Sequence, residues 1–267
     1  MDIWHGIFDR FRDAPSRGGA FDGKRWLNQS LQLMARYQGH NESNKTAPLS
    51  LDFSENPLAT VVAILQAELE LPPLRILDFG GGLGITYSMM IASLTTKDNI
   101  DFHVVENENI CRLGGEAFRN DSRISFHASL PSLENTDIVH VGSALQYIED
   151  WQSVITKLTK YKPKYWLFVD LPAGDIPTYV SSQRYYESTI PCWFFNIADI
   201  LSQMKKESFH LLFKTDFNGP ILGIRQGYPQ ANFPEKHRLG YSCNLLFSQQ
   251  LSSKKETLGS VTFSTDP

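Results

Sequence analysis

The apolar positions of the first 70 residues recur at helical spacing in two places. In residues 23–37 they fall at Trp26, Leu27, Leu31, Met34 and Ala35, a pattern typical of an amphipathic helix. A stronger pattern over residues 58–71 ends at two prolines, where helices usually stop. Because the first 50 residues are otherwise broken by Pro15 and several glycines, we expect residues 1–57 to form a helical cap without strands.

Beyond residue 73, short apolar runs alternate with helical stretches. Five runs are predicted to be strands: LRILDF, DFHVVE, RISFHAS, DIVHVGS and YWLFVDL. Three helical stretches lie among them: ITYSMMIASL, NICRLGGEAF and ALQYIEDWQSVITKL. This alternation is typical of a parallel sheet with helices on both faces. The run YWLFVDL is apolar at nearly every position, which predicts a central strand covered on both sides.

The last third of the chain departs from this alternation. Residues 172–191 are polar and aromatic without a clear period, after which WFFNIADILSQMKKE predicts a helix and FHLLFKTDF a sixth strand. A connection rich in Gly and Pro leads to a seventh strand, YSCNLLFSQQ, whose insertion we expect to be antiparallel. Residues 58–251 are therefore predicted to form a doubly wound α/β domain with a mostly parallel seven-stranded sheet, and residues 252–267 a polar tail.

Composition and charge narrow the classes of partner. The chain has 267 residues, of which 42% are hydrophobic, and a formal charge of −4, so it can build a full core but has no global basic field for nucleic acid. Its three cysteines show neither a CxxC pair nor histidines at zinc-ligand spacing, which predicts reduced thiols and no metal site. A small-molecule or glycan partner is expected.

The distribution of apolar residues also bears on membranes and location. Charges interrupt every turn of MDIWHGIFDRFRD at the start, and no apolar run approaches the roughly 18–20 residues of a membrane span. We expect a cytoplasmic protein without a membrane span. Its oligomeric state stays open, with a homodimer as one option.

The glycine-rich stretch ILDFGGGLGITY follows the first predicted strand of the domain. A dinucleotide-binding fingerprint needs G-x-G-x-x-G, but its third glycine would fall on Ile85 or Tyr87. The stretch instead carries D-x-G-x-G-x-G, with Asp78, Gly80, Gly82 and Gly84 in phase and Gly81 between them. An acidic residue fits a pyrophosphate poorly, whereas it suits a cofactor that has a cationic amine and no phosphate. Close packing of the following helix is the alternative role for these glycines.

Residues 74–87 resemble the first motif of the class I S-adenosylmethionine-dependent methyltransferases, and the resemblance covers about residues 58–250. It implies S-adenosyl-L-methionine as the cofactor, bound by Asp78 and the glycines. It also implies that Glu106, at the end of DFHVVE, accepts hydrogen bonds from both ribose hydroxyls, each worth about 1.5–3 kcal/mol. Asn107, Ser129 and Ser143 complete the implied cofactor site. A solvated carboxylate at Glu106 and a plain loop serine at Ser129 are the alternatives.

Three further stretches are similar to a narrower family of methyltransferases associated with surface-polysaccharide biosynthesis. They are WHGIFDRFRDAP, LQYIEDW and YVSSQRYYESTIPCWFFN. This resemblance implies that the methyl acceptor is an oxygen on a sugar or glycan precursor.

Methyl transfer to a hydroxyl needs in-line alignment and removal of a proton. In an open α/β sheet these tasks fall to residues beyond the carboxyl ends of the strands. Asp170 is the candidate base, with a carboxylate that caps the next turn as the alternative. His140 is the second catalytic candidate, although its place between Val139 and Val141 favours a histidine of the core. The candidates for acceptor binding are Tyr147, Thr178, Gln183 and Arg184.

Two other functions fit parts of these patterns. An NAD(P)-dependent sugar oxidoreductase would use a related fold, but the glycine spacing argues against it. A non-catalytic cofactor-binding protein on the same fold is the second alternative, because the sequence contains no unmistakable catalytic dyad.

Overall fold

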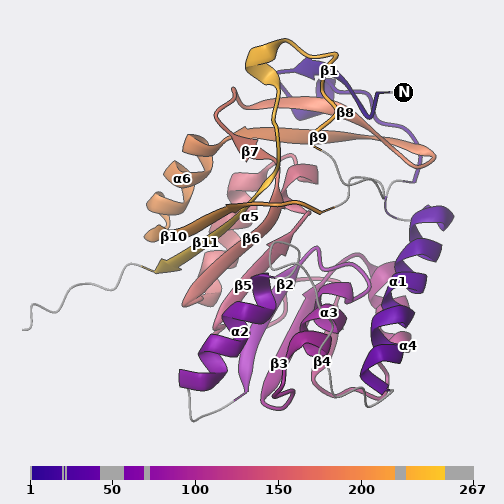
Figure 1. Cartoon of the computed structure of the whole chain (residues 1–267), viewed down its shortest axis with the longest axis vertical. Coiled ribbons are helices and arrows are strands. Elements are labelled where there is room, and N and C mark those ends of the chain that lie inside the picture. Colours follow the sequence, from indigo (N-terminus) through magenta and orange to yellow (C-terminus); the bar gives the residue numbers. More distant parts are fainter. Residues whose placement is uncertain are drawn as a thin grey trace, which may run out of the picture.

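A seven-stranded sheet is the main element of the computed structural model, which describes residues 2–19, 21, 23–42, 57–68, 73–219 and 227–249 (Figure 1). Its strand order is β10-β11-β6-β5-β2-β3-β4. All neighbours are parallel except β11, which is antiparallel to both β6 and β10. The predicted fold class and the antiparallel last strand are thus confirmed. The strands are β2 (Leu74–Phe79), β3 (Ile100–Val105), β4 (Ile124–His127), β5 (Ile138–Gly142), β6 (Tyr165–Leu171), β10 (Phe209–Asp216) and β11 (Cys243–Gln249).

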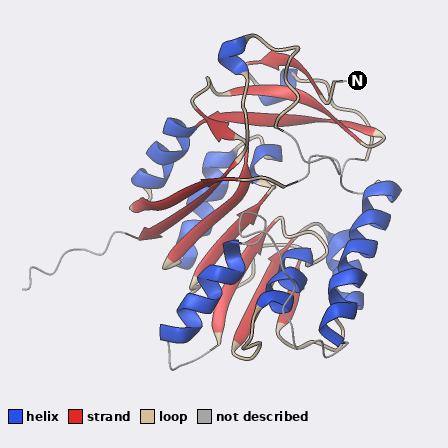
Figure 2. Ribbon diagram, viewed as in Figure 1, coloured by secondary structure: helices blue, strands red, loops and turns tan. Residues whose placement is uncertain are grey.

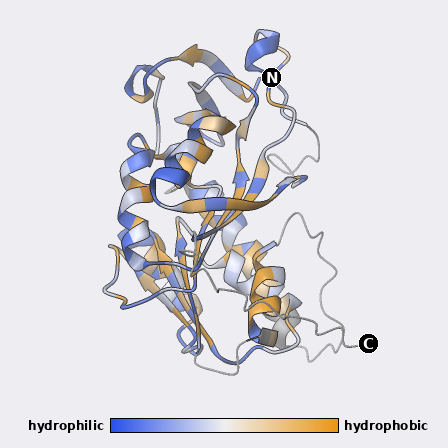
Figure 3. Cartoon of the chain, turned by 90° about the vertical axis from the view of Figure 1, so that its left-hand side faces the viewer, coloured by the Kyte–Doolittle hydropathy of each residue, from blue (hydrophilic) through white to orange (hydrophobic). Residues whose placement is uncertain are grey.

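Helices cover both faces of this sheet, as a doubly wound fold requires (Figure 2). Side chains of one face, such as Ile76, pack with the first four helices, while their neighbours, such as Leu77, pack with the last two. Figure 3 shows apolar residues along the strands between these layers. The helices are α1 (Lys24–Glu42), α2 (Pro57–Glu68), α3 (Ile85–Ser93), α4 (Glu108–Ala117), α5 (Trp151–Leu158) and α6 (Ile197–Lys206).

The predicted helix over residues 144–158 is shorter in the structure. A 3-10 turn at Leu145–Tyr147 comes first, and α5 begins only at Trp151. The side chain of Asp150 accepts a hydrogen bond from the backbone N–H of Ser153 and so caps this later start. Further 3-10 turns lie at Phe11–Asp13, Thr159–Tyr161 and Glu235–His237.

A second sheet was not foreseen from the sequence. It has the order β1-β8-β9-β7, and Figure 1 shows β1 beside β8 although they lie far apart in the chain. Trp193, expected to open a helix, belongs to β9, and α6 starts four residues later at Ile197. The strands are β1 (Trp4–Phe8), β7 (Ala173–Gly174), β8 (Tyr179–Tyr185) and β9 (Ser188–Asn196).

The polar residues of β8 explain why the hydrophobic pattern of the sequence does not predict this sheet. Ser181 and Ser182 are buried, and their hydroxyls donate to the backbone oxygens of His5 and Pro15. Partners so distant in sequence make a buried strand look like a polar loop. The N-terminal segment therefore contains a strand as well as the expected helix α1.

Some of the predicted domain boundaries, such as the one between residues 251 and 252, lie on residues outside the described ranges. The predicted tail, residues 252–267, lies outside the described residues. Across the described ranges, the helices are all too short or too polar to cross a bilayer.

Candidate functional site

Two adjoining cavities lie beyond the carboxyl ends of the parallel strands. The larger, here called the loop cavity, has a volume of about 600 Å³ and is lined by the glycine loop after β2 and by Glu106 after β3. The smaller, here called the aromatic cavity, has a volume of about 270 Å³ and is lined by Asp170, the second-last residue of β6. The loop cavity sits where the chain leaves β2 and β5 in opposite directions, the point at which such sheets bind ligands, and the aromatic cavity lies beside it at the ends of β5 and β6. They share four wall residues, Phe21, Ser143, Tyr147 and Tyr185.

The glycine loop has a backbone that tolerates few other residues. Gly80, Gly82 and Gly84 have φ angles of 71°, 57° and 78°, in the left-handed region that glycine adopts readily. A Cβ on Gly80 would lie 2.4 Å from the Cβ of Ala144, and one on Gly81 would lie 2.3 Å from Oδ2 of Asp78. A Cβ on Gly82 would meet only the ring of Trp26, at 3.9 Å. Gly82 therefore faces the open part of the loop cavity.

Gly84 has a different position from the other predicted glycines. It precedes α3 and packs against Phe118, Ile124 and Phe126, which would lie 3.0–3.2 Å from an added Cβ. It is not a wall residue of the loop cavity. At this position the alternative role, close packing of the helix, describes the contacts.

Asp78 and His140 form a buried pair beneath the glycine loop. Oδ1 of Asp78 lies 2.7 Å from Nδ1 of His140, and the two side chains are 0% and 3% exposed. Neither residue lines the loop cavity or the aromatic cavity. The structure thus brings two predicted site residues together, but in the core and not at a cavity wall.

Glu106 and Asn107 stand at the start of α4, on the wall of the loop cavity. Oε2 of Glu106 accepts a hydrogen bond of 2.8 Å from the backbone N–H of Asn107, whose own Oδ1 caps α4 by accepting from Ile110. The Glu106 carboxylate is therefore oriented by its neighbour. Ser129 is exposed and absent from the wall, where Ala128 takes its place.

Ser143 and Asp170 meet at the ends of β5 and β6. Both have positive φ angles, 51° and 53°, which are uncommon outside glycine and cluster at functional sites. The Ser143 hydroxyl donates a hydrogen bond to Oδ2 of Asp170. The Ser242 hydroxyl donates to Oδ1 at 2.5 Å, and Oδ1 of Asn244 accepts from the Asp170 backbone N–H at 3.1 Å.

Burial is the main cause of the shifted pKa values of the titratable groups around the aromatic cavity. It raises the pKa of the Asp170 carboxyl, and the hydrogen bonds from Ser143 and Ser242 oppose this rise. Burial also raises the pKa of the Tyr147 and Tyr228 hydroxyls, which stay protonated at neutral pH. Asp170 is thus a carboxyl group among neutral neighbours, well suited to accept a proton.

Two of the four predicted acceptor-binding residues line the aromatic cavity. The Tyr147 hydroxyl donates to Oε1 of Gln183 at 3.0 Å, and both residues are in the wall. Thr178 instead donates to Asp199 at 2.5 Å and accepts from the backbone of Asn196, outside both cavities. Arg184 follows Gln183 in β8 and is exposed on the other side.

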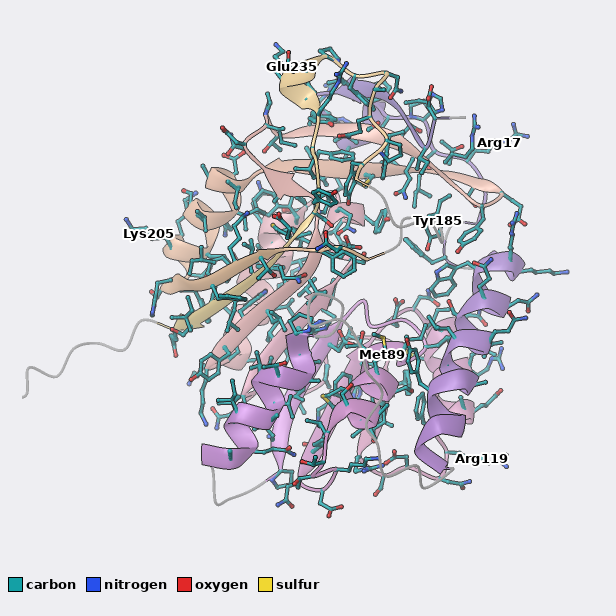
Figure 4. The ribbon with its side chains drawn as sticks, in the orientation of Figure 1. Arg17, Met89, Arg119, Tyr185, Lys205 and Glu235 are labelled. Atoms are coloured by element: carbon teal, nitrogen blue, oxygen red, sulfur yellow. The ribbon has the colours of Figure 1, made fainter. Side chains whose placement is uncertain are left out.

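Several aromatic wall residues were not predicted as site residues. Tyr185 lies at the end of the small sheet near α1 (Figure 4) and belongs to both cavities, as does Phe21. Trp4 and Tyr228 stack with ring centroids 4.8 Å apart in the wall of the aromatic cavity. For Trp4, Phe21 and Tyr185 the signal in the sequence is the excess of aromatic residues in the N-terminal and polar-aromatic segments, whereas Tyr228 lies in the connection rich in Gly and Pro and has no such signal. Among the described residues, no cluster of three acidic, His or Cys side chains could hold a metal.

Neither a protein-family model nor a curated protein sequence matches the chain. Solved structures do share its fold. A 1,6-didemethyltoxoflavin-N1-methyltransferase from Burkholderia thailandensis, with S-adenosylhomocysteine bound, is 11% identical, with 89% of this chain and 92% of that chain covered and a TM-score of 0.52. A magnesium protoporphyrin IX methyltransferase from Synechocystis PCC 6803, with its cofactor bound, is 14% identical over 79% and 91%, with a TM-score of 0.47. At 11% identity, the likeness to the Burkholderia enzyme shows a shared fold alone.

Proposed function

We propose that this protein is an S-adenosylmethionine-dependent methyltransferase whose acceptor is an oxygen on a sugar or glycan precursor. The observation that carries this proposal is the pair of cavities with a common wall of Ser143, Tyr147, Tyr185 and Phe21. Methyl transfer needs the methyl donor and the acceptor to be bound side by side, with the acceptor oxygen in line with the methyl group. A purely cofactor-binding protein would have no use for the second cavity.

The walls of the loop cavity fit the cofactor that the sequence motif implies. Gly80, Gly81 and Gly82 offer a surface without side chains, and the Glu106 carboxylate can accept two hydrogen bonds from a pair of ribose hydroxyls. The ring of Trp26 also lines this cavity, and two of its atoms would lie 3.9 Å from a Cβ on Gly82. When bound, S-adenosylmethionine supplies an electrophilic methyl group on a cationic sulfur.

The aromatic cavity fits a neutral acceptor with several hydroxyls. Gln183 and Tyr147 offer amide and hydroxyl groups, and the stacked rings of Trp4 and Tyr228 offer an apolar face. This combination of flat apolar and polar surfaces suits a sugar ring. Asp170 is the carboxylate of this cavity that can take the acceptor's proton.

We also propose a cytoplasmic homodimer. All three cysteines, Cys111, Cys192 and Cys243, are free thiols, as expected in a reducing compartment. The edge strand β10 exposes three consecutive apolar side chains, Leu211, Leu212 and Phe213. An exposed apolar edge of this kind is a surface on which a second copy can pair.

Calorimetry with S-adenosylhomocysteine and with NADH tests the cofactor, in the wild type and in Gly82→Val. The wild type should bind the first compound only. The variant should lose this binding, because a branched side chain would stand in the cavity at a residue with φ of 57°. Equal affinity in the variant would contradict the cofactor site, and binding of NADH would favour the oxidoreductase. Transfer of a labelled methyl group to a glycan extract then separates an enzyme from a binding protein.

A further inference from the structure

Ser143 is the shared wall residue of the two cavities whose side chain bonds to the carboxylate of Asp170. It lines both cavities, whereas Asp170 lines only the aromatic cavity. Its hydroxyl donates to Asp170. Because a serine hydroxyl has one proton and two lone pairs, this bond leaves Ser143 free to accept a further hydrogen bond from a bound ligand.

Hydrogen bonds from buried residues fix the orientation of the Asp170 carboxylate. The second carboxylate oxygen receives the Ser242 hydroxyl, and the side chain of Asn244 fixes the backbone. Ser242 is 1% exposed and lines neither cavity. Among the described residues no Lys, Arg or His forms an ion pair with Asp170. The one hydroxyl that connects this carboxylate with the common wall of the cavities is therefore that of Ser143.

The backbone conformation of Ser143 and Asp170 is a second, independent observation that singles out this contact. Ser143 and Asp170 end neighbouring parallel strands, and each adopts the left-handed conformation. Ser143 is fixed there by a hydrogen bond of 2.9 Å from its N–H to the carbonyl of Val169. Two adjacent residues in an unfavourable conformation, joined through their side chains, indicate a geometry retained for function.

We propose that Ser143 is a catalytic residue that relays the acceptor's proton to Asp170. The inference rests on the proposed methyltransferase function. The acceptor hydroxyl donates to Oγ of Ser143. As the acceptor oxygen forms its bond to the methyl carbon and the carbon–sulfur bond breaks, the hydroxyl proton passes to Oγ of Ser143. The proton already on Ser143 passes to Oδ2 of Asp170, so the bonding electrons of the broken bond stay on sulfur and Asp170 ends protonated.

The structure offers a matched pair of variants for this proposal. Ser143→Ala and Ser242→Ala each remove one hydroxyl from the same carboxylate, but only the first removes a wall residue. Initial rates are measured with methyl-labelled S-adenosylmethionine and the glycan fraction that the wild type labels. We expect Ser143→Ala to lower kcat by about a hundredfold or more, with the affinity for S-adenosylhomocysteine retained. Ser242→Ala should lose less than about tenfold and shift the rising limb of the pH profile to higher pH, because its hydrogen bond lowers the pKa of Asp170.

The outcomes separate this proposal from the one on which it rests. Equal losses of kcat in the two serine variants would mean that Ser143 only orients Asp170, which overturns the relay and leaves the methyltransferase standing. A higher KM for S-adenosylmethionine with unchanged kcat in Ser143→Ala would also overturn it, in favour of cofactor binding. If the wild type neither binds S-adenosylhomocysteine nor labels any fraction, the methyltransferase proposal itself fails, and the relay with it.

Discussion

Three carboxylates of the candidate site have different environments. Glu106 lies at a cavity wall, Asp170 lies in the second cavity, and Asp78 is buried in the core. We therefore expect different roles of them: ligand binding for Glu106, proton acceptance for Asp170 and stability of the fold for Asp78. The glycines around Asp78 exclude side chains from the space that a ligand would need.

Replacing Glu106 with Ala should weaken binding of S-adenosylhomocysteine by about ten- to a hundredfold, or about 1.5–3 kcal/mol. The reason is the loss of a charged acceptor for two hydroxyls at the loop-cavity wall. Isothermal calorimetry measures the change. Glu108→Ala is the control, because Glu108 is an exposed acidic residue of the same helix turn and lines neither cavity. Similar affinities in both variants would show that Glu106 does not hold the ribose.

His140→Ala should lower the free energy of unfolding by about 3–5 kcal/mol, since it leaves the Asp78 carboxylate buried without its partner. Denaturant titration gives this value. His140→Asn, which restores a hydrogen-bond donor, should recover part of the loss. If the Ala variant kept its stability and lost only methyl transfer, His140 would be catalytic despite its distance from the cavity walls.

At the scale of elements, the strands of the large sheet were accessible from the sequence and those of the small sheet were not. Strands such as β6 are apolar at nearly every position because they are covered on both faces. Strand β8 is also buried, but through Ser181, Ser182 and Gln183. These residues are satisfied by backbone atoms of the N-terminal segment and by Tyr147. No local pattern reveals such partners.

The same limit applies to the elements of the candidate site. The phase of the glycines predicted the loop beside the larger cavity, and the ends of the strands predicted Glu106 and Asp170 at cavity walls. Pattern analysis did not separate Gln183, which faces the cavity, from Arg184, which faces outward. That distinction depends on β8 being a strand, in which successive side chains alternate between the faces.

The edge strand β10 should mediate dimerisation. Leu211, Leu212 and Phe213 are 37%, 49% and 45% exposed. Antiparallel pairing of two copies of β10 about Phe213 would place His210 of one copy opposite Asp216 of the other. Leu212→Lys should therefore shift the protein to a monomer in light scattering, and Ile64→Lys, at an exposed apolar residue of α2, should not. A wild type that is monomeric at all concentrations tested would refute the pairing.

At the scale of the whole molecule, the N-terminal segment contacts two parts of the fold, the small sheet through β1 and helix α3 through α1. Strand β1 pairs with β8 in the small sheet, where Trp4 is buried between Phe194 and Tyr228. Helix α1 packs beside α3 and places Trp26 on the wall of the loop cavity. The segment therefore packs in the small sheet through β1 and contributes a wall residue of the loop cavity through α1.

Two tryptophan variants can separate these roles. Trp4→Ala should lower the free energy of unfolding by about 3–5 kcal/mol, because it removes a large buried ring from the small-sheet core. Trp26→Ala removes a partly buried ring and should destabilise the protein less, while it weakens binding of S-adenosylhomocysteine by about tenfold, or about 1.4 kcal/mol. Denaturant titration and calorimetry on both variants give the four values. If Trp26→Ala bound the ligand as well as the wild type does, α1 would be a packing element like β1, and the loop cavity would be complete without it.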